Sequence, residues 1–233
     1  MRRRGLRPVT ALVLPDPIAI DGPAASGKST LGEALSARFG YRFLDTGLMY
    51  RAVTLAAIRA GVAPVEDACA TLLKHLELTL RGEPIAHVYL GPEDVTPLLR
   101  DDAVEKNVSK YAALPVVRTA MVRQQRAFAL QGRAVLAGRD IGTVVLPEAP
   151  LKFYLEASEA ARARRRSAQT GEWGREQHHD EAHRDIAVRD EVDSAREASP
   201  MRPAGDAIII NTTDMTLDEV VHFVMEKVLC FAG

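Results

Sequence analysis

The chain has 233 residues, of which 47% are hydrophobic and 26% charged, and its formal net charge is -1. This length suits one α/β domain with small insertions, and the balanced charge excludes a global attraction to nucleic acid or to an anionic membrane. Cys69 and Cys230 cannot make a disulfide framework, which favours a reducing compartment. We therefore expect a cytoplasmic monomer with neither nucleic acid nor a membrane as partner.

Residues 1–16 are expected to form a flexible tail ahead of a folded domain at 17–233. Arg2, Arg3 and Arg4 precede the short apolar run at 9–14, as in an export signal. However, Pro15-Asp16-Pro17 ends that run without a small-residue cleavage site. No stretch reaches the roughly 18 apolar residues that a membrane helix needs.

The first part of the domain alternates short apolar runs with helical periods. Ile18–Ile20 predicts a buried strand, and residues 29–39 predict a helix that ends at Gly40. Tyr41–Leu44 predicts a second strand, and Thr46–Ala60 a second helix. A strand, a glycine-rich turn, a helix and another strand form a βαβ unit, which implies a parallel sheet covered by helices.

Residues 62–108 differ in character and predict a small insertion carried on the main sheet, with strands at Glu77–Leu80 and Ile85–Leu90. After it the pattern predicts a helix at Val116–Leu130, strands at Ala134–Ala137 and Leu151–Leu155, an arginine-rich helix at Ala157–Ser167, a polar mobile segment at 168–185, a strand at Ala207–Asn211 and a helix at Leu217–Phe231. The fold class is therefore α/β, with a central parallel sheet flanked by helices.

A phosphate-binding loop lies between the first predicted strand and the first predicted helix. The sequence Gly22-Pro23-Ala24-Ala25-Ser26-Gly27-Lys28-Ser29 satisfies G-x-x-x-x-G-K-[ST], and we expect residues from Gly22 to Thr30 to bind a nucleoside triphosphate. The glycines allow the loop to curl, and the helix presents free N–H groups to the anion. Lys28 is expected to reach the β- and γ-phosphates, and the Ser29 hydroxyl to ligate Mg²⁺.

A P-loop does not define a reaction, but arginines elsewhere suggest a second anion site, because arginine binds phosphate with a planar fork. The candidates lie near the ends of predicted elements or share a helix face: Arg51, Arg139, the trio Arg162, Arg165 and Arg166, and the pair Arg189 and Arg196 that flanks Asp190 and Asp193. The trio could instead form a nucleic-acid patch, although the nearby Glu156 and Glu159 disfavour that reading.

Four stretches resemble bacterial cytidylate kinases, from about Ile18 to the C-terminus. They are Ile18-Ala19-Ile20-Asp21-Gly22-Pro23, Leu44-Asp45-Thr46-Gly47 with Tyr50-Arg51, Gly138-Arg139-Asp140-Ile141-Gly142-Thr143-Val144-Val145, and Arg189-Asp190-x-x-Asp193-x-x-Arg196. The resemblance implies transfer of the ATP γ-phosphate to CMP or dCMP in a P-loop kinase fold.

The resemblance also implies a role for each matching residue. Arg51 and Arg139 would hold the acceptor phosphate, and Thr46, Ser109, Arg118 and Asp140 would surround the cytosine. Arg189 and Asp193 would contact the sugar, with Arg196 nearby. Arg162, Arg165 and Arg166 would belong to a lid at 157–185 that closes over ATP, and Lys28, Arg139, Arg162 and Arg165 would act in catalysis. Residues 62–108 would form an acceptor-binding insertion.

Other readings stay open on the residues alone. The acceptor could be another small molecule such as shikimate, or the chain could be a P-loop switch that hydrolyses nucleotide, although no guanine-reading N-K-x-D segment is present. The arginine helix could bind RNA. Asp45 could position Mg²⁺ through water or cap a helix. His178, His179 and His183 match no metalloprotease motif and are read as part of a solvated lid.

Overall fold

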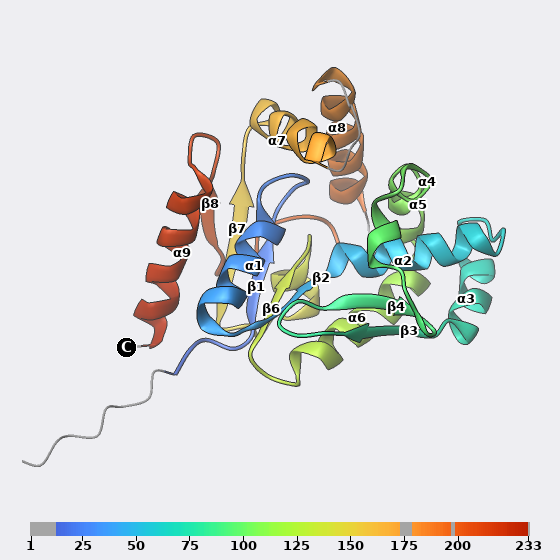
Figure 1. Cartoon of the computed structure of the whole chain (residues 1–233), viewed down its shortest axis with the longest axis horizontal. Helices are drawn as coiled ribbons and strands as arrows, with labels where there is room; N and C mark the ends of the chain where they lie inside the picture. The colour runs from blue at the N-terminus through green and yellow to red at the C-terminus, as the bar shows by residue number, and fades with distance from the viewer. Residues whose placement is uncertain (1–12, 173–178, 197–198, 233) are drawn as a thin grey trace, which may run out of the picture.

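The computed structural model describes residues 13–172, 179–196 and 199–232. A five-stranded parallel sheet in the order β2-β6-β1-β7-β8 forms its centre (Figure 1). The strands are β1 (Ile18–Asp21), β2 (Arg42–Asp45), β6 (Ala134–Ala137), β7 (Leu151–Glu156) and β8 (Ile208–Asn211). The predicted central parallel sheet is therefore confirmed.

Alternation along the strands divides the apolar side chains between two cores, one on each face of the sheet. On β1, Ile18 and Ile20 pack with Leu31 of α1 (Lys28–Phe39) and Val224 of α9 (Leu217–Ala232). Ala19, between them, points to the opposite core, to which α2 (Thr46–Arg59) and α6 (Pro115–Ala129) contribute. Successive side chains of a strand point to opposite faces, so strands covered on both sides are apolar throughout.

The insertion has a smaller sheet of its own, and it is attached to the main sheet. Residues 62–108 build an antiparallel sheet of β3 (Leu78–Arg81), β4 (His87–Leu90) and β5 (Glu93–Asp94), and Ile85 of this insertion bridges Phe43 of β2. The same region contains α3 (Glu66–His75), the 3₁₀ turn η1 (Thr96–Arg100) and α4 (Asp102–Glu105), and α5 (Val108–Ala112) follows it. These helices were not predicted; α4 and α5 are too short to show a helical period, whereas the ten-residue α3 was missed.

Two helices stand together beyond the carboxyl end of β7 (Figure 1). They are α7 (Glu159–Glu172) and α8 (His179–Ala195). The arginine-rich helix thus continues past Ser167, and the described part of 168–185, expected as a mobile segment, is helical. Residues 173–178 lie outside the described part.

The end of the expected tail is attached to the domain. The Tyr41 hydroxyl donates to the backbone oxygen of Pro15 at 2.6 Å. The Asp16 carboxylate accepts from the backbone N–H groups of Arg133, at 2.6 Å, and Ala134, at 3.0 Å. Leu14 packs against the core that contains α1 and α9. Within the described residues, no helix combines the length and apolarity needed to span a membrane.

Candidate active site

The P-loop follows β1 at the carboxyl edge of the parallel sheet, where open α/β sheets bind their ligands. Gly22 has φ +143°, and a Cβ there would lie 2.2 Å from the backbone oxygen of Leu155 on β7. Gly27, just before α1, has φ +101°. Because L side chains rarely adopt such angles, both positions need glycine. The resulting turn directs the positive end of α1 into the loop.

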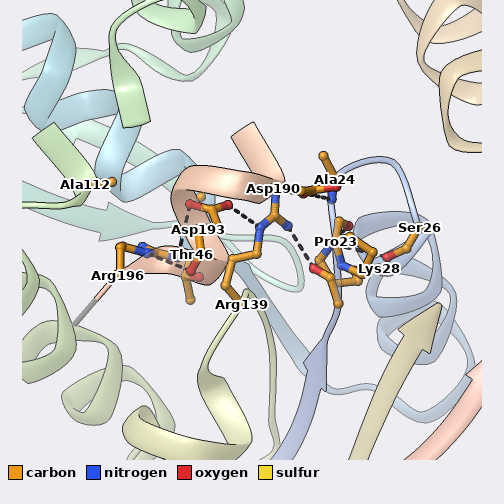
Figure 2. Close-up of polar contacts among 12 residues, drawn as sticks. Pro23, Ala24, Ser26, Lys28, Thr46, Ala112, Arg139, Asp190, Asp193 and Arg196 are labelled. Atoms are coloured by element: carbon orange, nitrogen blue, oxygen red, sulfur yellow. Dashed lines mark hydrogen bonds and ion pairs between the residues drawn. The ribbon is translucent and has the colours of Figure 1, made fainter. Parts of the chain in front are cut away.

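Lys28, the first residue of α1, lies inside the curve of this loop. Its Nζ donates to the Pro23 backbone oxygen at 2.6 Å and to the Ser26 hydroxyl at 3.3 Å (Figure 2). Only 9% of the residue is exposed, yet it lines the cavity described below. The Lys28 ammonium group is therefore held by the loop, where the loop would enclose phosphates.

Ser29 and Asp45 bring two oxygen groups together beside the loop. The Ser29 hydroxyl donates to Asp45 Oδ2 at 2.8 Å, while Asp45 Oδ1 accepts from the Gly47 N–H at 3.0 Å and so caps α2. Both residues line the cavity. Asp45 therefore caps a helix with one oxygen and reaches Ser29 with the other. A hydroxyl and a carboxylate are oxygen donors of the kind that Mg²⁺ prefers.

A cavity of about 330 Å³ connects the P-loop with the acceptor side. The predicted site residues that line it are Ala24, Ala25, Ser26, Gly27, Lys28, Ser29, Thr30, Thr46, Arg51, Ser109, Arg118, Arg139, Asp140, Arg166, Asp193 and Arg196. Glu33, Tyr50, Arg100, Glu105 and Gln169 also line it and were not predicted. A single cavity thus brings together residues from the P-loop to the helix α8.

Arg139 joins the two halves of this cavity (Figure 2). Its Nη1 donates to the Gly22 backbone oxygen at 3.0 Å, and its Nε donates to Asp193 Oδ2 at 2.7 Å. Arg196 Nη2 lies 3.0 Å from the other oxygen of Asp193. Burial acts to lower the pKa of Arg139, but Asp193 and other nearby carboxylates outweigh it and the net shift is upward. The guanidinium therefore stays charged.

Arg118 and Asp140 form a buried ion pair on the acceptor side. The Arg118 guanidinium also lies over the Tyr50 ring, 5.4 Å from its centroid. Thr46 donates its hydroxyl proton to the backbone oxygen of Ala137 at 2.9 Å, at the end of β6. These polar groups, with Ser109 on α5, line the same cavity as the P-loop.

Asp21 is a functional candidate that sequence reasoning missed. Its two carboxylate oxygens accept from the backbone N–H groups of Ile141 and Gly142, each at 2.7 Å, where the π-helical turn η2 (Ile141–Val145) begins. Burial raises its pKa to about 6, although those two N–H groups act to lower it. Asp21 thereby fixes the turn that presents Arg139 and Asp140. The available signal was an acidic residue at the end of an otherwise apolar strand.

Glu105 was also missed, and no motif contains it. Its carboxylate pairs with Arg51 of α2 through one oxygen and with Arg166 of α7 through the other. The three residues belong to three elements that are distant in sequence, so no local spacing could reveal the contact.

Arg162 and Arg165 share a helix face with Arg166 but make different contacts. Arg162 pairs with Asp190 of α8, whose carboxylate also accepts from the backbone N–H of Ala24 in the P-loop at 3.0 Å. Arg165 donates to the hydroxyl of Thr212, after β8, at 2.9 Å. Arg189 lies on α8, but its side chain falls outside those described.

The profile of the family described as cytidylate kinase matches residues 18–229. A cytidylate kinase of Lactiplantibacillus plantarum is 45% identical over 206 residues, which cover 88% of this chain and 90% of that protein. A cytidylate kinase of Nocardia farcinica is 45% identical over 207 residues, covering 88% and 89%.

Among solved structures, a shikimate kinase of Acinetobacter baumannii in complex with shikimate matches with a TM-score of 0.48 and 13% identity, covering 94% of this chain and 95% of that one. A TM-score below 0.5 at this sequence identity does not contribute to the family assignment. The profile match and the two sequence relatives carry it: the chain belongs to the cytidylate kinase family.

Proposed function

We propose that this protein transfers the γ-phosphate of ATP to CMP or dCMP, giving ADP and CDP or dCDP. One observation supports this above the others: a single cavity is lined both by the P-loop and by Arg51, Arg139 and the Arg118–Asp140 pair. Such a reaction needs two phosphates in line and their charge neutralised, with little covalent work for the protein.

On the donor side, the P-loop N–H groups and Lys28 would hold the β- and γ-phosphates of ATP. An oxygen of the acceptor phosphate would attack the γ-phosphorus, and the bond between that phosphorus and the β–γ bridging oxygen would break. Arg139 supports this assignment because it reaches from the Gly22 backbone toward the acceptor side. A guanidinium there can stabilise charge on the transferred group without being deprotonated.

Mg²⁺ would enter with the nucleotide and be held on the protein by the Ser29 hydroxyl, with Asp45 beside it. The two groups fit because both are oxygen donors already in contact at 2.8 Å. The described residues contain no group of three or more His, Cys, Asp or Glu that could hold a metal by themselves. The ion would neutralise phosphate charge.

On the acceptor side, the Arg118–Asp140 pair and Ser109 supply both donors and acceptors. Cytosine presents an amine donor beside the N3 and O2 acceptors, so a carboxylate together with donors complements it. Arg189 and Asp193 would contact the sugar, Asp193 by accepting from a hydroxyl, with Arg196 nearby. Arg51 and Arg139 would bind the acceptor phosphate.

Segments 62–108 and 157–185 would serve as acceptor-binding insertion and lid, the latter with Arg162, Arg165 and Arg166. Closure of the lid over bound nucleotide would exclude water, so that the γ-phosphoryl group passes to the acceptor and not to water. Asp190 supports a link between the lid and the P-loop because it contacts both Arg162 and Ala24.

A coupled assay of ADP production with ATP and CMP, dCMP, UMP or AMP tests the proposal, and shikimate extends the panel. CMP and dCMP should be the best acceptors. Absence of turnover with both would refute the function, and equal ADP release without any acceptor would favour a hydrolytic switch.

We further propose that the enzyme acts as a cytoplasmic monomer without nucleic-acid or membrane partners. Cys69 and Cys230 are both free thiols, which supports a reducing compartment. Light scattering during chromatography should give a mass near 25.4 kDa. Salt-sensitive RNA binding without ATP would contradict the absence of a nucleic-acid partner.

A further inference from the structure

Glu105 lies where the acceptor side meets the helix α7. It is the last residue of α4, and its side chain is 22% exposed and lines the cavity. One carboxylate oxygen pairs with Arg51 on α2 and the other with Arg166 on α7. The side chains of the two arginines are 9% and 17% exposed, so all three charges are largely removed from water.

The contacts of Arg51 define the plane of its guanidinium. Its Nη1 donates to the Leu99 backbone oxygen at 3.0 Å and to the Glu105 carboxylate. An Nη nitrogen carries two hydrogens, so these two acceptors account for both. Because the guanidinium is planar and rigid, fixing one nitrogen fixes the directions of the remaining N–H groups.

The charges of Arg51, Arg166 and Glu105 also favour binding of a phosphate. Two guanidinium groups and one carboxylate sum to a net charge of about +1 within the cavity wall, which leaves an attraction for a phosphate. Without the carboxylate, two buried like charges would repel each other. Glu105 therefore allows two cations to stay close without cancelling the site's affinity for an anion.

Resting on the proposed function, we propose that Glu105 is a positioning residue that orients Arg51 toward the acceptor phosphate and makes acceptor binding depend on Arg166 of α7. Arg166, expected from sequence to serve ATP, acts on the acceptor side through this carboxylate. Glu105 itself does not contact the reacting atoms.

Steady-state kinetics of Glu105→Gln test the positioning role. Gln keeps the shape but cannot offer a charged acceptor to each arginine, so the KM for CMP should rise about tenfold. The KM for ATP should change less than about twofold, and Glu105→Asp should recover part of the loss. Glu93→Gln is the matched control, because Glu93 pairs with Arg59 on the exposed surface outside the cavity.

A double-variant cycle tests the dependence on Arg166. Arg166→Gln should raise the KM for CMP in the wild-type background and add little in the Glu105→Gln background. Equal effects in the two backgrounds would overturn the inference, as would an effect confined to the KM for ATP.

Two further outcomes separate the possible failures. A lower KM for CMP in Glu105→Gln would mean that Glu105 competes with the phosphate, which contradicts the positioning role. Wild-type protein that does not phosphorylate CMP would refute the proposed function and this inference with it, whereas an active wild type with an unchanged Glu105→Gln variant would refute this inference alone.

Discussion

The two ends of the cavity are built in different ways. At the donor end, the site is formed by consecutive residues of one loop. Lys28 donates hydrogen bonds to the Pro23 backbone oxygen and the Ser26 hydroxyl of that same loop. At the acceptor end, side chains from α2, α4, α6 and α8 and from the turn before η2 are brought together by folding. The donor end is thus a local structure, whereas the acceptor end depends on the tertiary fold.

The acceptor end also depends on paired charges. The acceptor-side arginines are paired with carboxylates: Arg118 with Asp140, Arg139 with Asp193, and Arg51 with Glu105. Removing one partner of a buried pair leaves an uncompensated charge, which is more costly than losing the pair. We therefore expect substitutions that break one of these pairs to lower stability as well as turnover.

The largest effect is expected for Lys28→Ala. Loss of the cation that reaches the β- and γ-phosphates should reduce kcat/KM by about 10³-fold, since removal of one transition-state donor commonly costs about 10²–10³. Activity near that of the wild type would refute the P-loop assignment.

Arg118→Met should destabilise the folded protein by about 3 kcal/mol, because Asp140 is left buried without its cation. Urea denaturation at neutral pH measures this. The double variant Arg118→Met, Asp140→Leu should regain most of the stability but not the turnover of CMP. A single variant as stable as the wild type would show that the acceptor end does not depend on paired charges.

Asp193→Ala should lower kcat/KM for CMP by about 10²-fold, corresponding to about 2.7 kcal/mol, through lost sugar contacts and a released Arg139. The KM for ATP should change less than that for CMP. An effect seen only in the KM for ATP would contradict the acceptor-side placement of Asp193.

Asp21→Asn should give the smallest effect, visible as a change in pH dependence. The pKa of Asp21 is about 6 in the folded protein, whereas an unperturbed aspartate has a pKa of 3.8. The folded state therefore binds more protons than the unfolded state between these values, and this group's contribution to stability falls as pH rises through that window.

Between about pH 5 and about pH 7.5, the stability of Asp21→Asn relative to the wild type should increase by about 1 kcal/mol. Urea denaturation at the two pH values measures the difference. A difference that does not change with pH would mean that Asp21 does not titrate in this range.

The parts of the molecule that could be predicted from sequence are those with local signals. The strand before Gly22, the helix after Gly27 and its end at Gly40 follow from apolar periodicity and turn chemistry. The strands of the insertion were predicted, but short alternating strands do not reveal that they form a separate sheet. Glu105 and Asp21 were missed because their partners lie far along the chain.

The position of β1 has a consequence for synthesis of the protein. Its two neighbours are β6, where Ile18 aligns with Val135, and β7, where Ile18 aligns with Leu151. As the ribosome releases the chain from the N-terminus, the strand that carries the P-loop has no sheet neighbour until more than half of the protein has been made. Nascent chains that end before β6 should not retain ATP, and pull-down of stalled chains on an ATP resin would measure this.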